Sequence, residues 1–335
     1  MYVPGSDAYR KLSATDTMRL RYLFLIWFLL LPAACHKTPQ AEEVFIRFET
    51  AAAKSANPPE ELVGDVNLFI FNCSGVLQEH LYAKDAGKGV KVTLFREEPY
   101  TVYACVNLGY RMQECTMEQL EGMRFYLTYP DEFSRGIPMT GVAREVTVGE
   151  DSELCLELER CMAKVEIRLD RSGLYSGIDL EVKRIEVGAC PRSAFLFAQS
   201  KVRSSDDLFA EGYYKDGSAL NTGAGNGLSK PEVLYLLENC QGNLLEDVTG
   251  PEDKVFPALD KTGELCSWVE IWATYYSGRY NTRPGEYLKY RFYLGEDLCN
   301  FDVRRNVCYS FTVRPEGNGL NESSWRVDRS AIEAI

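Results

Sequence analysis

The chain has 335 residues, with 49 acidic and 37 basic side chains and a net charge of -12. This acidic balance argues against nucleic acid as a partner, because a phosphate backbone binds to basic surfaces. Hydrophobic residues make up 45% of the chain, which is enough for packed cores, and the length favours two domains over one.

A short apolar run near the amino terminus indicates export. Residues 22–31 carry no charge and follow Arg19 and Arg21. A membrane-spanning helix needs about 20 apolar residues, and a buried core helix would not require the preceding arginines. The pattern therefore favours a signal peptide that begins at Met18, which leaves residues 1–17 as an extension ahead of it.

Cys35 follows the small residues Ala33 and Ala34 and resembles the lipid-modified cysteine of a bacterial lipoprotein signal. The match departs from the usual pattern, because Leu31 lies four residues before the cysteine instead of three. The resemblance implies that Cys35 is diacylated and becomes the first residue of the mature protein, since two acyl chains make a stable anchor. The alternative is a plain secretory signal with a chance cysteine. We therefore expect residues 1–35 to be an extension and a lipoprotein signal peptide.

Ten more cysteines follow, at positions 73, 105, 115, 155, 161, 190, 240, 266, 299 and 308. An exported protein can form disulfides, but this spacing shows no compact framework. Several of the cysteines lie in apolar runs, where a thiol packs as a small hydrophobe. We expect mostly buried thiols with one or two bridges. With His36 and His80 as the two histidines and no Cys-x-x-Cys, we expect no metal site and no cofactor.

After the signal, short runs of alternating apolar and polar residues predict strands, because Gly, Pro and Asn separate them. The predicted strands are 44–48, 66–71, 90–95, 100–106, 145–148, 154–158, 163–169, 178–187, 268–276, 287–294 and 308–313. Thr116 and Gln119 form a capping-box pattern that predicts one short helix. Residues 199–232 are rich in Ser, Gly, Asp and Asn and predict loops.

These elements predict an all-β protein built from two tandem β-sandwich domains with one short helix. A change of texture around residues 147–153 is the predicted boundary. We therefore expect an N-terminal sandwich at 36–150 and a C-terminal sandwich at 151–335.

The first predicted strand has an unusual connection. Val44, Ile46 and Phe48 would face inward and Arg47 outward, and an irregular linker with Pro58-Pro59 follows. A strand joined so loosely could leave its groove and be replaced by a strand of another chain. The alternative is an ordinary first strand that stays in place.

No catalytic motif is present. The sequence lacks G-x-S-x-G, H-E-x-x-H and a phosphate-binding loop, and His80 is the one histidine in the predicted folded part. We therefore expect no catalytic residues and no enzymatic activity.

The strand at 268–276 offers one candidate binding surface. Trp268, Glu270 and Trp272 would share a face, with Val269 and Ile271 on the other. The two tryptophans could stack on a sugar ring, or they could pack against a loop or a second sheet, as large aromatic side chains commonly do.

Five stretches, in chain order, resemble the Bacteroides-type fimbrillin superfamily, which comprises pilins and the anchor and tip subunits of type V pili. They are VNLFIFNCSGVL (66–77), YTVYACVNLG (100–109), IPMTGVAREVTV (137–148) with LERCMAKVEI (158–167), VLYLLENCQG (233–242) and YRFYLGEDLCNFDVRRNVCYSFTV (290–313). The resemblance implies two transthyretin-like β-sandwich domains. It also implies a surface-exposed lipoprotein of the outer membrane that joins other fimbrial subunits by exchange of donor strands.

The resemblance also bears on processing and on position in a pilus. In polymerising members an arginine-specific protease removes the anchor and first strand, so Arg47 is the candidate cut site here, with Lys54 a poor substitute. Anchor members stay uncut and keep their lipid. Ten residues follow Trp325, which favours a terminal subunit at base or tip, where a host or bacterial surface receptor is a further partner. The alternative function is a surface lipoprotein that binds glycans through Trp268 and Trp272.

Overall fold

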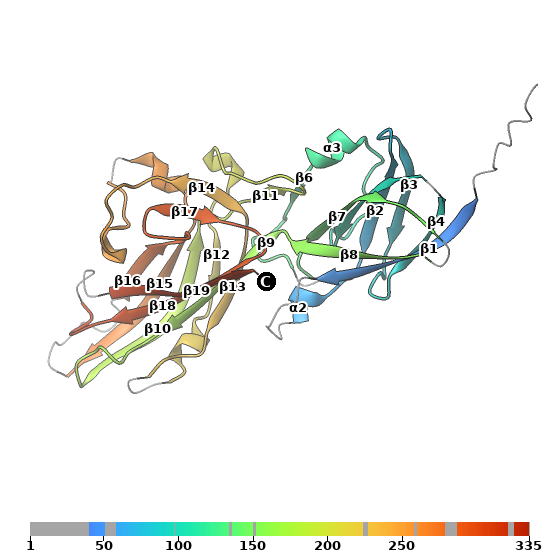
Figure 1. Ribbon diagram of the computed structural model, residues 1–335. Coiled ribbons are helices and arrows are strands. Elements are labelled where there is room, and N and C mark those ends of the chain that lie inside the picture. Colours follow the sequence, from blue (N-terminus) through green and yellow to red (C-terminus); the bar gives the residue numbers. More distant parts are fainter. Residues whose placement is uncertain are drawn as a thin grey trace, which may run out of the picture. The chain divides into compact units, whose positions relative to one another are not determined.

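The computed structural model describes residues 40–50, 58–96, 98–133, 136–149, 152–223, 227–257, 260–278, 287–320 and 325–334. The described residues from Ala41 onward belong to one compact unit, which is almost entirely β-structure (Figure 1). None of the helices in these ranges has the length and hydropathy that a membrane crossing requires.

The amino-terminal half forms a seven-stranded sheet in the order β3-β2-β5-β7-β8-β1-β4. Its strands are β1 (Ala41–Thr50), β2 (Val66–Asn72), β3 (Leu77–Ala83), β4 (Val90–Phe95), β5 (Tyr100–Val106), β7 (Met139–Val146) and β8 (Glu153–Arg160). The β7–β8 pairing covers two residue pairs at one end of the hairpin. Apolar side chains from both halves of the sheet meet in a single core, which makes this part a sandwich.

Two four-stranded sheets form the second sandwich, in the orders β12-β10-β15-β16 and β13-β9-β18-β19. The strands are β9 (Met162–Leu169), β10 (Ile178–Gly188), β12 (Tyr213–Lys215), β13 (Glu232–Leu237), β15 (Trp268–Ser277), β16 (Tyr287–Tyr293), β18 (Val307–Pro315) and β19 (Trp325–Ala334). Their inward side chains form the largest apolar core of the described chain. The predicted all-β fold of two tandem sandwiches is confirmed.

Short elements complete the fold. Two ribbons pair β6 (Arg124–Tyr126) with β11 (Ser193–Phe195) and β14 (Asn239–Asn243) with β17 (Asn300–Val303). The single-turn 3-10 helices are η1 (Ser205–Asp207), η2 (Ser218–Asn221), η3 (Pro251–Asp253) and η4 (Lys261–Leu265). The prediction of loops at 199–232 is confirmed except where the segment forms β12, η1 and η2. The last residue of this segment, Glu232, is the first residue of β13.

The predicted helix is confirmed as α3 (Met117–Glu121). Thr116 Oγ1 accepts the backbone N–H of Gln119 at 3.2 Å, and Gln119 Oε1 accepts that of Thr116 at 2.9 Å, so both halves of the capping box form.

The prediction of irregular structure at Pro58-Pro59 is wrong, because α2 (Pro58–Glu61) forms one helical turn there. The N–H groups of the first turn of a helix have no hydrogen-bond partner within the helix. A proline, which lacks an N–H, therefore loses no helical hydrogen bond at this position. Acidic Glu60 and Glu61 also lie in this turn, where the helix dipole favours a negative charge.

Cys161 lies between β8, the last strand of the seven-stranded sheet, and β9, the first strand of the second sandwich. The expected boundary at 150 and 151 falls before β8, which pairs with β1. We therefore propose that the division lies at Cys161. A third apolar cluster joins the outer faces of both sandwiches there; it includes Phe69, Phe71, Tyr103, Leu120, Cys161, Met162, Leu196 and Tyr235.

Nine of the cysteines are free thiols, namely those at 73, 105, 115, 155, 161, 190, 240, 266 and 299. The disulfides that the sequence analysis expects are not found among these nine. Five of these are buried and pack as small hydrophobes, while Cys73 and Cys155 are exposed. Burial raises the pKa of the Cys161 thiol to about 11, so it stays protonated at neutral pH.

Candidate functional site

The first strand, β1, lies inside the seven-stranded sheet and not at its edge (Figure 1). Residues Ala41–Ile46 pair antiparallel with β4, and residues Phe45–Thr50 pair parallel with β8. The backbone of β1 therefore supplies hydrogen-bond partners to two strands at once, and its removal would expose both.

The side chains of β1 alternate as the sequence predicts. Val44 and Ile46 are 1% and 0% exposed and contribute to the amino-terminal core, and Phe48 packs partly against it. Burying a Val or Ile side chain contributes about 1.5–3 kcal/mol. Gly89 approaches β1 so closely that a Cβ there would lie 2.5 Å from the Ile46 carbonyl oxygen. The groove around β1 is therefore closely fitted to an extended strand with apolar residues at alternate positions.

Arg47 lies on the outward face of β1, with about half of its side chain exposed, and forms an ion pair with Glu153 of β8. Its backbone is part of the parallel pairing with β8, opposite Cys155. A protease that binds its substrate as an extended strand would compete with β8 for these backbone groups. Cleavage after Arg47 therefore requires β1 to separate locally from β8.

Cys35, the predicted lipid attachment site, lies outside the described residues. Its acylation stays a prediction.

Trp268 and Trp272 share the outer face of β15, as predicted. The ring of Trp272 lies between Arg184 of β10 and Lys289 of β16, with the Arg184 Cζ at 3.6 Å and the Lys289 Nζ at 3.5 Å from the ring centroid. Arg291 lies 3.7 Å from the ring centroid of Trp268. Because such cation–π contacts are favourable, a sugar would have to displace these cations before it could stack on either ring. Glycan contact through these two residues stays a prediction.

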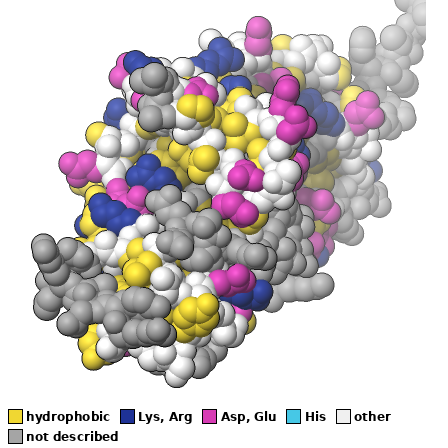
Figure 2. Space-filling model, turned by 90° about the vertical axis from the view of Figure 1, so that its left-hand side faces the viewer, with side chains coloured by type: hydrophobic (Ala, Val, Ile, Leu, Met, Phe, Trp, Pro, Cys, Tyr) yellow, Lys and Arg dark blue, Asp and Glu magenta, His cyan; other side chains and the backbone are white. Residues whose placement is uncertain are grey.

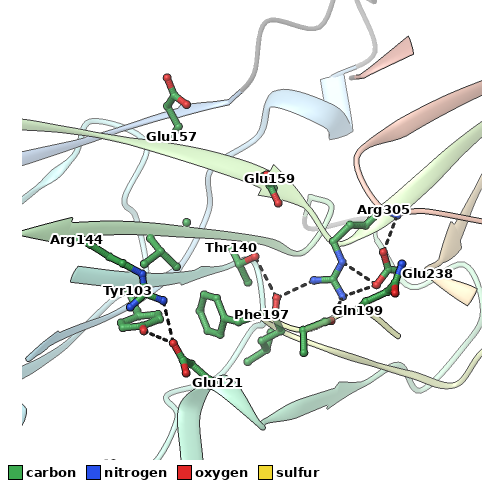
Figure 3. A pocket seen from close by; sticks show the side chains of 14 residues that line it. Tyr103, Glu121, Thr140, Arg144, Glu157, Glu159, Phe197, Gln199, Glu238 and Arg305 are labelled. Atoms are coloured by element: carbon green, nitrogen blue, oxygen red, sulfur yellow. Dashed lines mark hydrogen bonds and ion pairs between the residues drawn. The ribbon is translucent and has the colours of Figure 1, made fainter. Parts of the chain in front are cut away.

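A cavity of about 720 Å³ lies where β5, β7 and β8 face the segment after β11 (Figure 3). Tyr103 donates its hydroxyl to Glu121 Oε1 at 2.5 Å, and Arg144 donates to the same oxygen at 3.0 Å. The bond from Tyr103, together with that from Arg144, lowers the pKa of Glu121. Burial, reinforced by the bond to Glu121, raises the pKa of Tyr103 to about 12.

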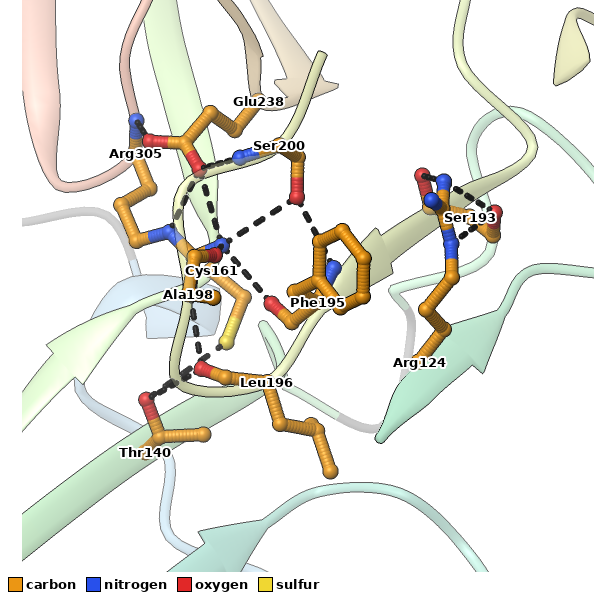
Figure 4. Close-up of polar contacts among 10 residues, drawn as sticks. All are labelled: Arg124, Thr140, Cys161, Ser193, Phe195, Leu196, Ala198, Ser200, Glu238 and Arg305. Atoms are coloured by element: carbon orange, nitrogen blue, oxygen red, sulfur yellow. Dashed lines mark hydrogen bonds and ion pairs between the residues drawn. The ribbon is translucent and has the colours of Figure 1, made fainter. Parts of the chain in front are cut away.

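A second group of bonds closes the other end of this cavity (Figure 4). Arg305 donates to the carbonyl oxygens of Phe195 at 2.7 Å, Leu196 at 2.8 Å and Ala198 at 2.8 Å, and pairs with Glu238 at 2.9 Å. Sequence reasoning missed this network. Arg305 and Glu238 both lie in stretches that resemble fimbrillins, but nothing in those stretches indicates that the two side chains meet.

The described residues offer no arrangement for metal binding, since no group of three or more His, Cys, Asp and Glu side chains comes together in them. His80 stacks on Phe69 with ring centroids 4.1 Å apart, and its Nε2 lies 3.3 Å from Asn67 Oδ1. Burial lowers the pKa of His80. Its contacts are therefore those of a packed side chain.

The face seen in Figure 2 carries acidic and basic side chains interspersed with hydrophobic ones. A polyanion would meet carboxylates beside the cations on this face.

Replacing Tyr103 by Phe should lower the free energy of unfolding by about 1–2 kcal/mol at pH 8, because a partly buried hydrogen bond to a carboxylate is lost. The folded chain holds the Tyr103 proton up to about pH 12, whereas the ordinary value is 10.0. The contribution of this hydroxyl is therefore complete below pH 10 and declines as the pH rises towards 12.

Urea denaturation of both proteins at pH 8, 10 and 11 measures this difference. Tyr126→Phe, which removes a hydroxyl from a side chain that is 70% exposed, is the control and should match the wild type at pH 8. A difference between wild type and Tyr103→Phe that stays constant across these pH values would contradict the assignment.

Comparisons with known proteins identify the fold. The tip fimbrial protein Mfa3 from Porphyromonas gingivalis with C-terminal truncation matches with a TM-score of 0.55 at 12% identity, over 88% of this chain and 100% of that chain. The fimbrilin FimA from Porphyromonas gingivalis matches with a TM-score of 0.54 at 13% identity, over 87% of this chain and 97% of that chain. Residues 234–313 match a family model described as domain of unknown function DUF4906. No curated protein is similar enough in sequence to be matched.

At these identities the comparisons show the fold alone. The chain has the fimbrillin-type fold that its sequence motifs imply, and the predicted resemblance is confirmed at that level.

Proposed function

We propose that this chain is a structural subunit of a cell-surface fimbrium, as an anchor, minor or tip component, and that it assembles by donor-strand exchange. The observation that carries the fimbrial role is the fold, which the chain shares with a tip fimbrial protein and a fimbrilin over most of its length. Under this proposal lipidated Cys35 holds the protein at the outer membrane, its partners are other fimbrial subunits and, at a tip, a surface receptor, and it has no catalytic activity.

The proposed exchange site is the groove that β1 fills. Val44 and Ile46 enter the core from one face of the strand, and both strand edges are paired. A strand from another chain with apolar residues at the same alternate positions would restore the main-chain bonds and refill the core. Because side chains alternate with a period of two, a shift of one residue would place polar groups in the core, so the groove also sets the register.

The carboxyl-terminal strand supports the role of strand acceptor. β19 pairs antiparallel with β18, from Pro315 opposite Trp325 to Val307 opposite Ala334. Trp325 is 2% exposed, and its ring stacks on Tyr290 with centroids 4.7 Å apart. Since β19 completes its own sandwich, donating it would cost that core a strand. Accepting a strand in place of β1 carries no such cost to the second sandwich.

Cutting after Arg47 should make the chain competent to take up a strand. The experiment treats purified protein with an arginine-specific protease, separates the released segment and adds a fluorescent peptide with the sequence of residues 41–47, the part of β1 that the cut removes. We expect the cut protein to bind the peptide and the intact protein to bind at least about tenfold more weakly, because its groove is filled. Fluorescence anisotropy measures the difference.

The matched control is Arg47→Gln, which removes this cut site and should leave the protein unable to bind the peptide after the same treatment. A second peptide with Ser at the positions of Val44 and Ile46 should bind weakly to the cut protein. Equal binding by cut and intact protein would refute strand exchange at β1. The mature amino terminus from cells separately tests acylation of Cys35.

A further inference from the structure

A second concave site lies away from β1, between the segment that follows β5, strand β6 and the segment before β7. Its volume is about 350 Å³, which is at the small end of ligand pockets. The residues that line it include Asn107, Tyr110, Tyr126, Thr128, Glu132 and Gly136.

Two tyrosines line this cavity and remain exposed. The side chains of Tyr126 and Tyr110 are 70% and 51% exposed, and neither belongs to an apolar core of the described chain. An aromatic ring with a hydroxyl at its tip presents an apolar face and a polar handle together. These two rings therefore offer contact surface that the fold itself does not use.

The strand that carries Tyr126 is held firmly. β6 pairs with β11, with Tyr126 opposite Ser193, and Leu127 N donates to the Arg192 carbonyl oxygen at 3.0 Å. Arg124 donates from Nε and a terminal nitrogen to Ser193 Oγ at 3.1 Å and 2.9 Å (Figure 4). The position of the Tyr126 backbone is thus fixed before any ligand arrives.

The floor of the cavity is also preorganised. The Asn107 side chain donates to the carbonyl oxygens of Leu62 at 2.7 Å and Ile137 at 2.8 Å, and accepts the Gly64 N–H at 2.8 Å. Gly136 has a φ of +105°, and a Cβ there would lie 2.5 Å from Asn107 Nδ2. Rigid walls reduce the ordering that a ligand must impose, which favours binding.

Among the described residues that line the cavity, Glu132 carries a charge. Its Oε2 accepts the backbone N–H groups of Thr128 at 2.6 Å and Tyr129 at 3.3 Å, which leaves Oε1 as an acceptor for a ligand hydroxyl. The negative charge of this carboxylate disfavours an anionic ligand.

Aromatic faces that contact C–H groups, together with acceptors for hydroxyl groups, are the chemistry that recognises a sugar ring. We propose that this cavity binds one neutral pyranose residue of a glycan, with its ring against Tyr126 and Tyr110 and a hydroxyl on Glu132. The proposal goes beyond the fimbrial role, because it assigns a ligand class to a subunit surface, and it does not depend on strand exchange at β1.

The test is a glycan array of neutral oligosaccharides, with sialylated and uronic-acid oligosaccharides alongside, probed with the full chain and with Tyr126→Ala. We expect the wild type to bind neutral glycans, and Tyr126→Ala to weaken that binding about tenfold because one stacking face is lost. The matched control is Tyr276→Ala, since Tyr276 is 66% exposed on β15 of the other sandwich. This variant should bind like the wild type.

Tyr110→Ala provides a second, independent variant and should also weaken binding. The proposal is overturned if the wild type binds no neutral glycan, if it binds acidic glycans alone, or if Tyr126→Ala binds as well as the wild type. Equal losses in Tyr126→Ala and Tyr276→Ala would also overturn it. The peptide-uptake assay at β1 reads out the proposed function separately, so failure of one does not imply failure of the other.

Discussion

Replacing Lys164 by Met should lower the free energy of unfolding by about 3–5 kcal/mol, because it leaves a buried carboxylate without its cation. Lys164 is 1% exposed, and its Nζ lies 3.1 Å from Glu60 Oε1 and 3.0 Å from Glu166 Oε1. Glu60 is 0% exposed and also accepts the Tyr235 hydroxyl at 2.6 Å. Methionine has a similar length and no charge, so the loss reports mainly on electrostatics.

Chemical denaturation measures the free energy of unfolding of both variants. Lys91→Met is the matched control, because it breaks an exposed ion pair instead of a buried one. Lys91 pairs with Glu43 at 2.5 Å, but both side chains are more than 60% exposed. Its replacement should cost less than about 1 kcal/mol. The double variant Lys164→Met with Glu60→Gln should recover part of the stability, since the buried carboxylate that has lost its cation is then removed as well. If Lys164→Met and Lys91→Met cost the same, the buried pair does not carry the role assigned to it.

The pH dependence of this pair follows from its surroundings. Burial alone would lower the pKa of Lys164, but hydrogen bonds to Glu166 and Glu60 raise it above its usual value of 10.5. The stabilisation by this group is therefore fully present below pH 10.5 and is lost as the pH rises above that value.

This buried pair also bears on the proposed strand exchange. Glu60 belongs to α2, the first described element after β1, while Lys164 belongs to β9 and Tyr235 to β13 of the second sandwich. Arg160, at the end of β8, donates from Nε to the Glu60 carbonyl oxygen at 2.9 Å. Glu60 and α2 are thus fixed to both sandwiches, and these contacts would hold α2 in place during the proposed exchange of β1.

The sequence predicts well what depends on local pattern. Alternation places Val44 and Ile46 inward and Arg47 outward, and the capping box places α3, because each signal lies within a few residues. The strands β3, β12, β13 and β19 of the two sandwiches are not predicted, nor are the strands of the two short ribbons, and the predicted strand at 145–148 covers only the last two residues of β7. In β3, with the sequence LQEHLYA, apolar residues do not alternate regularly, and its place in the sheet comes from pairing with β2.

Sequence reasoning fails where both faces of a strand are covered. Lys164 alternates with buried Ala163 and Val165, which predicts a polar face in water. That face is instead covered by α2 and by the third apolar cluster, whose members come from positions far apart in the chain. The cations beside Trp272 are a similar case, since they come from the neighbouring strands β10 and β16 and not from β15 itself.

Arg305→Met should lower the free energy of unfolding by about 3–5 kcal/mol, because the partner Glu238 is 4% exposed and would keep a buried charge without its cation. The substitution also removes donors from three carbonyl groups in the segment between Phe195 and Ala198. Arg305→Lys should recover little of the loss, since a lysine cannot reproduce the planar set of donors that a guanidinium directs at several acceptors.

Arg47 is the matched control, because it pairs with Glu153 and both side chains are about half exposed. Arg47→Met should cost less than about 1 kcal/mol in the same denaturation experiment. Hydrogen exchange should also differ between the two variants. Arg305 lies between β17 and β18, and its bonds hold the segment that forms one wall of the cavity of about 720 Å³. Faster amide exchange at residues 196–200 in Arg305→Met alone is therefore expected. Unchanged amide exchange in this segment would show that other contacts hold it in place. The stabilising role of Arg305 would then come from its ion pair with Glu238 alone.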